Sequence, residues 1–294
     1  MMSLSAIIVL FAVQFVHIKS ARILAVYPTP SISHQVVFRS LTDELIKHGH
    51  QITVITTDPK YPKGQSPKNL TEIDMHDLSY RIWKDVLLHV KSADQESTAL
   101  EMLLRGASNV FKAQLRTQEF QEIIQKKKGE YDLLLLEAYL KPGLVLSEIF
   151  KVPVILVSSL GAVNENFRAV GVPTHPFIYP SPVQRKIYNL TNLEKLQQWY
   201  EHWKMENIFS AIDVEDDKML KSMFGQGIPY IDELMNNIDM LIINMHPIWL
   251  ENQPVPPSTI YVGGLHLKPP QDLPKVCNSS GTHGSRNFAR TKST

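Results

Sequence analysis

The chain has 294 residues, of which 44% are hydrophobic and 20% charged, a composition that supports one large globular domain or two small ones. The formal net charge of +1 gives no electrostatic attraction for nucleic acid, so we expect no nucleic-acid partner. The single cysteine, Cys277, excludes an intrachain disulfide.

The N-terminus resembles a targeting segment. Ala6 to Val16 is an apolar run of the length of a secretory h-region, and it ends near Lys19-Ser20-Ala21. The run is too short for a good membrane anchor. We therefore expect residues 1–20 to be a cleaved signal peptide, and the protein to reside in the secretory pathway, either in the endoplasmic reticulum lumen or secreted.

Three Asn-X-Ser/Thr triplets are acceptors for N-glycosylation if the chain enters that pathway. They begin at Asn69, Asn189 and Asn278. Such triplets often arise by chance, so their meaning depends on the signal peptide.

The residues that follow predict a strand–loop–helix–strand unit. A short apolar run, Arg22 to Tyr27, is typical of a buried parallel strand, and a second such run spans Gln51 to Thr56. The segment up to His48 between them has apolar residues at helical spacing, with Ser31 or Ser33 available as N-cap and Gly49 as terminator. Loops that follow parallel strands are where such sheets bind ligands.

One histidine, His34, lies at the start of the predicted helix. The partial positive charge of a helix N-terminus disfavours a second positive charge on the imidazole, and a neutral imidazole can accept a proton. The simpler alternative is a solvated loop histidine, one of 11 in the chain.

The rest of the chain alternates short apolar runs with helical patterns, which predicts an α/β fold: a Rossmann-like, mainly parallel sheet covered by helices on both faces. The further strands are predicted at 80–82, 131–136, 154–157, 239–244 and 259–262. Helices are predicted at 98–104, 118–127, 144–150 and 193–205.

Two later segments differ from this pattern. Residues 159–187 contain Pro173, Pro176, Pro180 and Pro182, which predicts a long surface loop or lid. Residues 276–294 have too few apolar side chains to order themselves, so we expect a disordered tail. Between them, a helix carries Leu193, Leu196, Trp199, Tyr200 and Trp203. Core packing is the expected role of this face, with membrane contact as the alternative.

Several stretches resemble the UDP-glycosyltransferases of the glucuronosyltransferase type, particularly their insect members. They are ARILAVYPTPSISHQVVFRSLTDELIKHGHQITVITTDP, YDLLLLEAYL, SSLGAVNENFRAVGVPTHPFIYPSP and LIINMHPIWLENQPVPPSTIYVGGLHLKPP. Together they run from about Arg22 to Pro274. The resemblance implies that residues 21–275 form the N-terminal, acceptor-binding lobe of a GT-B glycosyltransferase.

The resemblance also implies roles for individual residues. His34 matches the catalytic histidine, which takes the proton of an acceptor hydroxyl as the sugar is transferred from a UDP-sugar with inversion. Glu137 stands where the family has an aspartate that pairs with this histidine, and its extra methylene suggests a looser hold on the imidazole. Ser33, Tyr139 and Ser159 are the expected acceptor-binding residues. The family needs no metal and no cofactor besides the UDP-sugar co-substrate, and the sequence has no cluster with metal-ligand spacing.

Two functions remain open at this point. The first is a truncated UDP-glycosyltransferase whose family reaction uses a small lipophilic acceptor. The second is a non-catalytic lipophile-binding or regulatory lobe, which could pair with a full-length relative. The family's UDP-sugar-binding signature has no counterpart after Gly263-Gly264, so we expect the chain alone to transfer sugar poorly.

Overall fold

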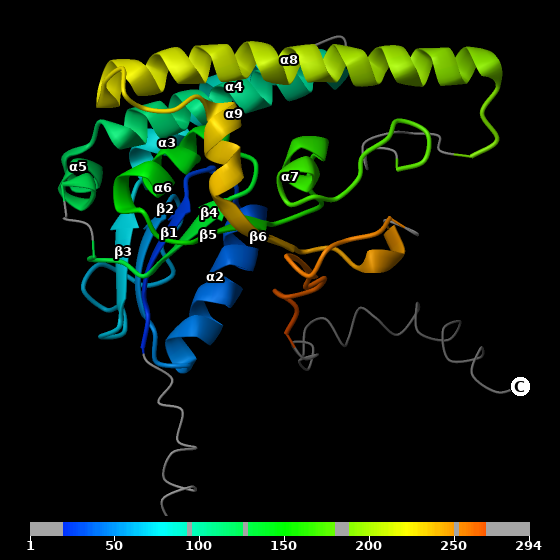
Figure 1. The fold of residues 1–294 in the computed structure, drawn as a ribbon. Coiled ribbons are helices and arrows are strands. Elements are labelled where there is room, and N and C mark those ends of the chain that lie inside the picture. The colour runs from blue at the N-terminus through cyan, green and yellow to red at the C-terminus, as the bar shows by residue number, and fades with distance from the viewer. Residues whose placement is uncertain (1–19, 93–95, 126–128, 180–187, 250–252, 269–294) are drawn as a thin grey trace, which may run out of the picture.

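The computed structural model describes residues 20–92, 96–125, 129–179, 188–249 and 253–268. Seven parallel strands form one sheet in the order β3-β2-β1-β4-β5-β6-β7, with helices packed around it (Figure 1). The sheet grows in opposite directions on the two sides of the boundary between β1 and β4: β2 and β3 are added next to β1, and β5, β6 and β7 are added next to β4. The predicted α/β, Rossmann-like fold is confirmed. The proposed signal peptide, apart from its last residue Ser20, and the proposed tail lie outside the described residues.

Six of the seven strands were expected, within one or two residues. They are β1 (Arg22–Tyr27), β2 (Gln51–Thr56), β4 (Leu133–Glu137), β5 (Val154–Ser158), β6 (Ile238–Ile243) and β7 (Thr259–Tyr261). The strand β3 (Leu70–Asp74) was not predicted, because its residues are half polar, as suits the edge of a sheet. The strand predicted at 80–82 is wrong, since these residues lie inside the helix α3 (His76–Val90).

Both faces of the sheet are buried, and β1 shows this directly. Leu24 and Val26 pack in the larger core, whereas Ile23, Ala25 and Tyr27 pack in a second core on the opposite face. The helix α2 (Ile32–Lys47) covers this second core through Phe38. Strands with apolar side chains on both faces require such two-sided cover.

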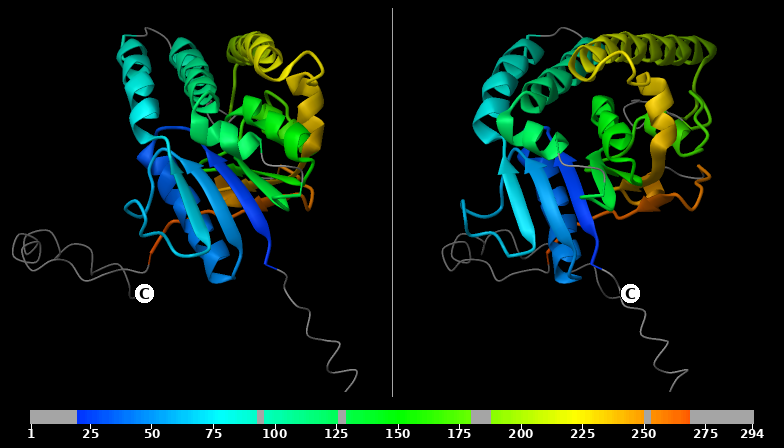
Figure 2. Two further views of the ribbon diagram at one scale, coloured as in Figure 1. Left: turned by 90° about the vertical axis from the view of Figure 1, so that its left-hand side faces the viewer. Right: turned by 60° about the vertical axis from the view of Figure 1, so that its left-hand side comes forward.

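The larger core lies under the other helices. The longest of these, α4 (Glu96–Leu115) and α8 (Asn192–Phe224), run beside α3 as a row across one face of the sheet (Figures 1 and 2). Gly106 allows α3 and α4 to approach closely, because a Cβ there would lie 2.6 Å from a methyl group of Val86. The remaining helical elements are α5 (Gln118–Ile124), η1 (Lys141–Leu144), α6 (Val145–Phe150), α7 (Asn164–Ala169), α9 (Ile231–Leu234), η2 (Met235–Asn237) and η3 (Pro247–Trp249).

Three expectations about helices need correction. The helices α4 and α8 are much longer than predicted, because their polar faces hide the apolar spacing beyond 98–104 and 193–205. The predicted loop at 159–187 contains the short helix α7, while 180–187 lie outside the described residues. The expected core face of α8 is solvent-exposed: Leu193, Leu196, Trp199, Tyr200 and Trp203 are all more than half exposed.

Among the described helices, none combines the length and the hydropathy that a membrane span requires.

Candidate functional site

A histidine–glutamate pair lies at the carboxyl edge of the sheet, between β1 and β4. His34 stands in the first turn of α2, which follows β1, and Glu137 is the last residue of β4. Because β1 and β4 are parallel neighbours, their carboxyl ends meet at one edge. Nδ1 of His34 lies 2.8 Å from Oε1 of Glu137, as the sequence predicts.

The carboxylate of Glu137 is fully enclosed and uses both oxygens. Its side chain is 0% exposed, and Oε2 accepts a hydrogen bond of 3.1 Å from the backbone N–H of Thr29. The looser hold on the imidazole that the extra methylene of glutamate suggests stays a prediction. The longer side chain is held at both ends of its carboxylate, by His34 and by the loop after β1.

That loop is in turn fixed by two buried glutamine side chains. The amide of Gln35 donates to the carbonyl groups of Tyr27 and Thr29, at 2.9 and 3.1 Å. The amide of Gln114 donates to the carbonyl of Pro28 at 2.9 Å. Buried carbonyl groups without partners are costly, so these bonds stabilise the loop geometry that places Thr29 and His34 around Glu137.

Tyr139 lies beside the pair. Its ring centre is 6.0 Å from that of His34, and its hydroxyl contacts the carbonyl oxygen of Gly161 and the hydroxyl of Ser158, the latter at 3.2 Å. Burial raises the pKa of this phenol to about 12, a change that the hydrogen bond from Ser158 opposes and the nearby carboxylate of Glu137 reinforces. Tyr139 is therefore a neutral, half-buried wall of the site.

The other two predicted acceptor-binding residues occupy different surroundings. Ser33 is exposed on the outer side of the first turn of α2, with its hydroxyl 3.0 Å from that of Ser31. Ser159 is 1% exposed, and its hydroxyl has no hydrogen-bond partner among the described residues. Neither is among the residues that line the pocket described next.

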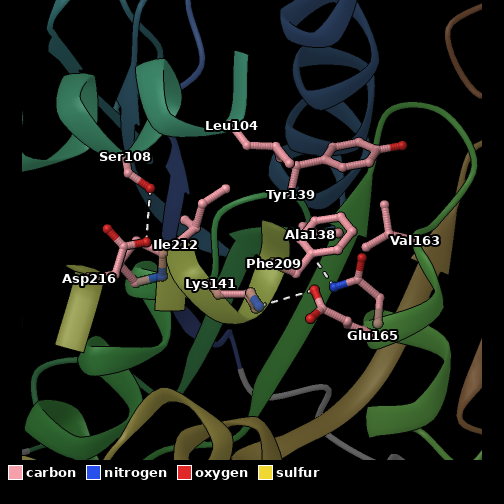
Figure 3. A pocket seen from close by; sticks show the side chains of 12 residues that line it. Leu104, Ser108, Ala138, Tyr139, Lys141, Val163, Glu165, Phe209, Ile212 and Asp216 are labelled. Atoms are coloured by element: carbon pink, nitrogen blue, oxygen red, sulfur yellow. Dashed lines mark hydrogen bonds and ion pairs between the residues drawn. The ribbon is translucent and has the colours of Figure 1, made fainter. Parts of the chain in front are cut away.

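A pocket opens beside Tyr139, between the carboxyl edge of the sheet and the helices above it (Figure 3). Its apolar wall includes Leu104 on α4, Val163 before α7, and Phe209 and Ile212 on α8. Its polar wall includes Ser108, Lys141, Glu165, Asn166 and Asp216.

These polar residues were not among the predicted site residues. The sequence of α8 could have pointed to Asp216, because at helical spacing one face of this helix carries it together with Phe209, Ile212 and Asp213. A carboxylate on an apolar face of a helix indicates a buried functional or structural role. Lys141 lies four residues after the end of β4, and a charged residue in the connection after a strand likewise indicates a functional role.

The described residues contain no cluster of histidine, cysteine, aspartate and glutamate side chains that could hold a metal ion. The two glycosylation candidates within them differ. Asn69 donates hydrogen bonds from its side-chain amide to the carbonyl groups of Ile46 and His50, whereas Asn189 is exposed.

Comparison with known proteins gives a consistent result. The model of the family "UDP-glucoronosyl and UDP-glucosyl transferase" matches residues 22–289. An ecdysteroid UDP-glucosyltransferase of Spodoptera littoralis nuclear polyhedrosis virus is 30% identical over 85% of this chain and 51% of its own length. The ecdysteroid UDP-glucosyltransferase of Lymantria dispar multicapsid nuclear polyhedrosis virus is 34% identical over 85% of this chain and 50% of its own length.

The chain thus spans about half the length of the curated relatives it matches. Among solved structures, a glycotransferase of kitacinnamycin is 16% identical, covers 83% of this chain and 52% of that chain, and gives a TM-score of 0.48.

Proposed function

Because the chain belongs to the UDP-glucuronosyl and UDP-glucosyl transferase family, we propose that it supplies the acceptor-binding lobe of a GT-B glucosyltransferase and the base that activates the acceptor. The observation that carries the proposal is the 2.8 Å contact between Nδ1 of His34 and the enclosed carboxylate of Glu137. Such a pair orients an imidazole and stabilises its protonated form during proton transfer.

The contact determines which ring nitrogen reacts. An ionised carboxylate only accepts hydrogen bonds, so Nδ1 carries the hydrogen and Nε2 has the free lone pair. His34 is 17% exposed, so its ring is largely enclosed but not sealed from a ligand. Nε2 is the atom that receives the proton of the acceptor hydroxyl.

In the proposed reaction, the acceptor oxygen forms a bond to the anomeric carbon of the sugar as its proton passes to Nε2 of His34. The bond between the anomeric carbon and the phosphate oxygen breaks, and UDP leaves with that electron pair. Glu137 stabilises the imidazolium that results, and Tyr139 bounds the acceptor on one side.

The names of the relatives support a specific donor and acceptor class. Both viral proteins are described as ecdysteroid UDP-glucosyltransferases, so we propose UDP-glucose as donor and the hydroxyl of a small, largely apolar molecule as acceptor, with an ecdysteroid as the first acceptor to test. The mixed apolar and polar wall beside Tyr139 is typical of a site that binds such a molecule.

The test uses the purified 294-residue chain and a chimera that joins it to the C-terminal half of the Lymantria dispar virus relative. Both are incubated with radiolabelled UDP-glucose and an ecdysteroid. Transfer by the chimera, and its loss in His34→Ala, would support the proposal. A chimera that binds both substrates but transfers equally well with and without His34 would overturn it.

A further inference from the structure

The pocket beside Tyr139 has an unusual balance of charge. Lys141 provides the one cationic side chain among the described residues that line it, and its Nζ lies 3.0 Å from Oε2 of Glu165 and 2.5 Å from Oδ1 of Asp213. Asp216, one turn further along α8, is 5% exposed and accepts a hydrogen bond of 2.9 Å from the hydroxyl of Ser108 (Figure 3). Two carboxylates therefore contact one ammonium group, and a third carboxyl group lines the same pocket.

The charge of Lys141 is already balanced. It is shared by two carboxylates, and its ammonium also lies 5.4 Å from the ring centre of Phe209. An anionic ligand would have to displace one of these carboxylates and would meet the remaining ones at close range. Like charges at such distances in a partly buried site cost binding energy.

A second observation concerns Asn166, which also lines the pocket. Its side chain is 1% exposed, and its amide nitrogen donates to the carbonyl oxygen of Ala138 at 2.9 Å. Its amide oxygen has no hydrogen-bond partner among the described residues. A buried acceptor without a partner is costly, and a ligand that donates a hydrogen bond would remove that cost.

We propose that this pocket selects acceptors that carry a basic nitrogen at the end remote from the reacting hydroxyl and disfavours acceptors that carry a carboxylate there. The inference rests on the proposed function, because it takes as the acceptor site the pocket lined by Tyr139, whose ring centre lies 6.0 Å from that of His34. The carboxyl groups outnumber the ammonium group, which favours a cationic ligand. The amide oxygen of Asn166 favours a ligand that donates a hydrogen bond. The ring of Phe209 offers a further favourable surface for a cation.

The test compares three phenols of similar size that differ in the charge of the tail: tyramine, 4-propylphenol and 3-(4-hydroxyphenyl)propionate. Binding to the purified 294-residue chain is measured by calorimetry at about pH 8, where free amines and carboxylates are both charged. We expect tyramine to bind most tightly and the propionate about tenfold or more weaker than the neutral phenol.

Two variants assign the preference to the pocket. Asp216→Asn keeps an acceptor for the Ser108 hydroxyl but removes a negative charge, so it should reduce the difference between tyramine and the propionate. Glu201→Gln removes an exposed carboxylate from the same helix and should leave the difference unchanged. The wild-type series needs no variant, so it decides the question even if Asp216→Asn fails to fold.

The outcomes separate this inference from the proposed function. Equal affinities for the three phenols, or an unchanged order in folded Asp216→Asn, would overturn the inference while leaving sugar transfer by the chimera intact. The expected order of affinities without any transfer by the chimera would support the charge preference and overturn the proposed reaction. Binding of none of the phenols would overturn the inference.

Discussion

His34 and Glu137 lie 103 positions apart in the sequence, yet their side chains meet at 2.8 Å because the strands that precede them are parallel neighbours. Glu137 also accepts the N–H of Thr29, so one carboxylate ties the end of β4 both to α2 and to the loop after β1. The geometry of this pair is thus a direct product of strand order.

Replacing His34 with alanine in the chimera should lower the rate of transfer roughly 100- to 10,000-fold, the usual contribution of a general base. Initial rates at saturating UDP-glucose measure this effect. His48→Ala is the matched control, since that side chain is exposed at the other end of α2. Near-normal turnover by His34→Ala would show that another group takes the proton.

Glu137→Gln keeps the size of the side chain but removes its charge. The imidazolium then lacks its counter-charge, and the amide can orient the wrong tautomer, so we expect a loss of roughly 100- to 10,000-fold in kcat. Glu137→Asp keeps the charge but shortens the reach to His34 and Thr29, and it should also lower kcat. Full activity in Glu137→Asp would contradict the view that the glutamate length is matched to this site.

Gln35→Met should destabilise the fold by about 1–3 kcal/mol, because it leaves the buried carbonyl groups of Tyr27 and Thr29 without this donor. Urea denaturation of the 294-residue chain measures the free energy of unfolding. Gln118→Met, on the exposed start of α5, should change it far less. Equal effects of the two substitutions would mean that the loop is not held by Gln35.

Stability should fall as the pH rises from about 4 to about 7. Burial raises the pKa of Asp216 to about 7, well above its ordinary value, although the hydrogen bond from Ser108 opposes the change. At pH values between the ordinary pKa of an aspartate and the raised pKa of Asp216, the folded protein binds more protons than the unfolded chain. The free energy of unfolding therefore decreases as the pH rises. Burial also raises the pKa of Glu165 and of Asp213, in the same direction.

Asp216→Asn should therefore flatten this pH dependence in part, as measured by urea denaturation at a series of pH values. Glu201→Gln, exposed on the same helix, should leave the slope as it is. A slope that is identical in Asp216→Asn and in the unmodified protein would contradict the assignment to Asp216.

If the chain enters the secretory pathway, Asn189 should carry a glycan more completely than Asn69. Asn189 is exposed, whereas the side-chain nitrogen of Asn69, the atom that receives the sugar, donates to two backbone carbonyl groups. Mass spectrometry of peptides from protein expressed in insect cells measures the occupancy of each site. Full occupancy of Asn69 with an empty Asn189 would reverse this expectation.

Local patterns predicted the part of the fold that holds His34. The run from β1 through α2 to β2 has clear periodicity and clear end signals, so its elements and the position of His34 followed from the sequence. The position of Glu137 at the end of β4 followed in the same way. The contact of Glu137 with the N–H of Thr29 could not be predicted, because it depends on how the loop bends.

Other features depended on contacts between distant segments. The residues at 80–82 have an aromatic and an isoleucine in alternation, yet they join α3 because its apolar face packs on α4. The exposed aromatic face of α8 contradicts the expected core role, since this half of the helix extends past the sheet that could have covered it (Figure 1). The partners of Asp213 and Asp216 likewise come from η1 and α4, far away in sequence.

The wall that carries Asp213 and Asp216 belongs to the long connection between β5 and β6, whereas His34 and Glu137 stand directly on strand ends. Substitutions in that connection can alter the shape and charge of the pocket wall without altering the hydrogen bonds of the sheet. Under the proposed function, substitutions in one helix would change which acceptors bind while the proton transfer at His34 stayed the same. Diversity of substrates and constancy of reaction are then encoded in separate stretches of the chain.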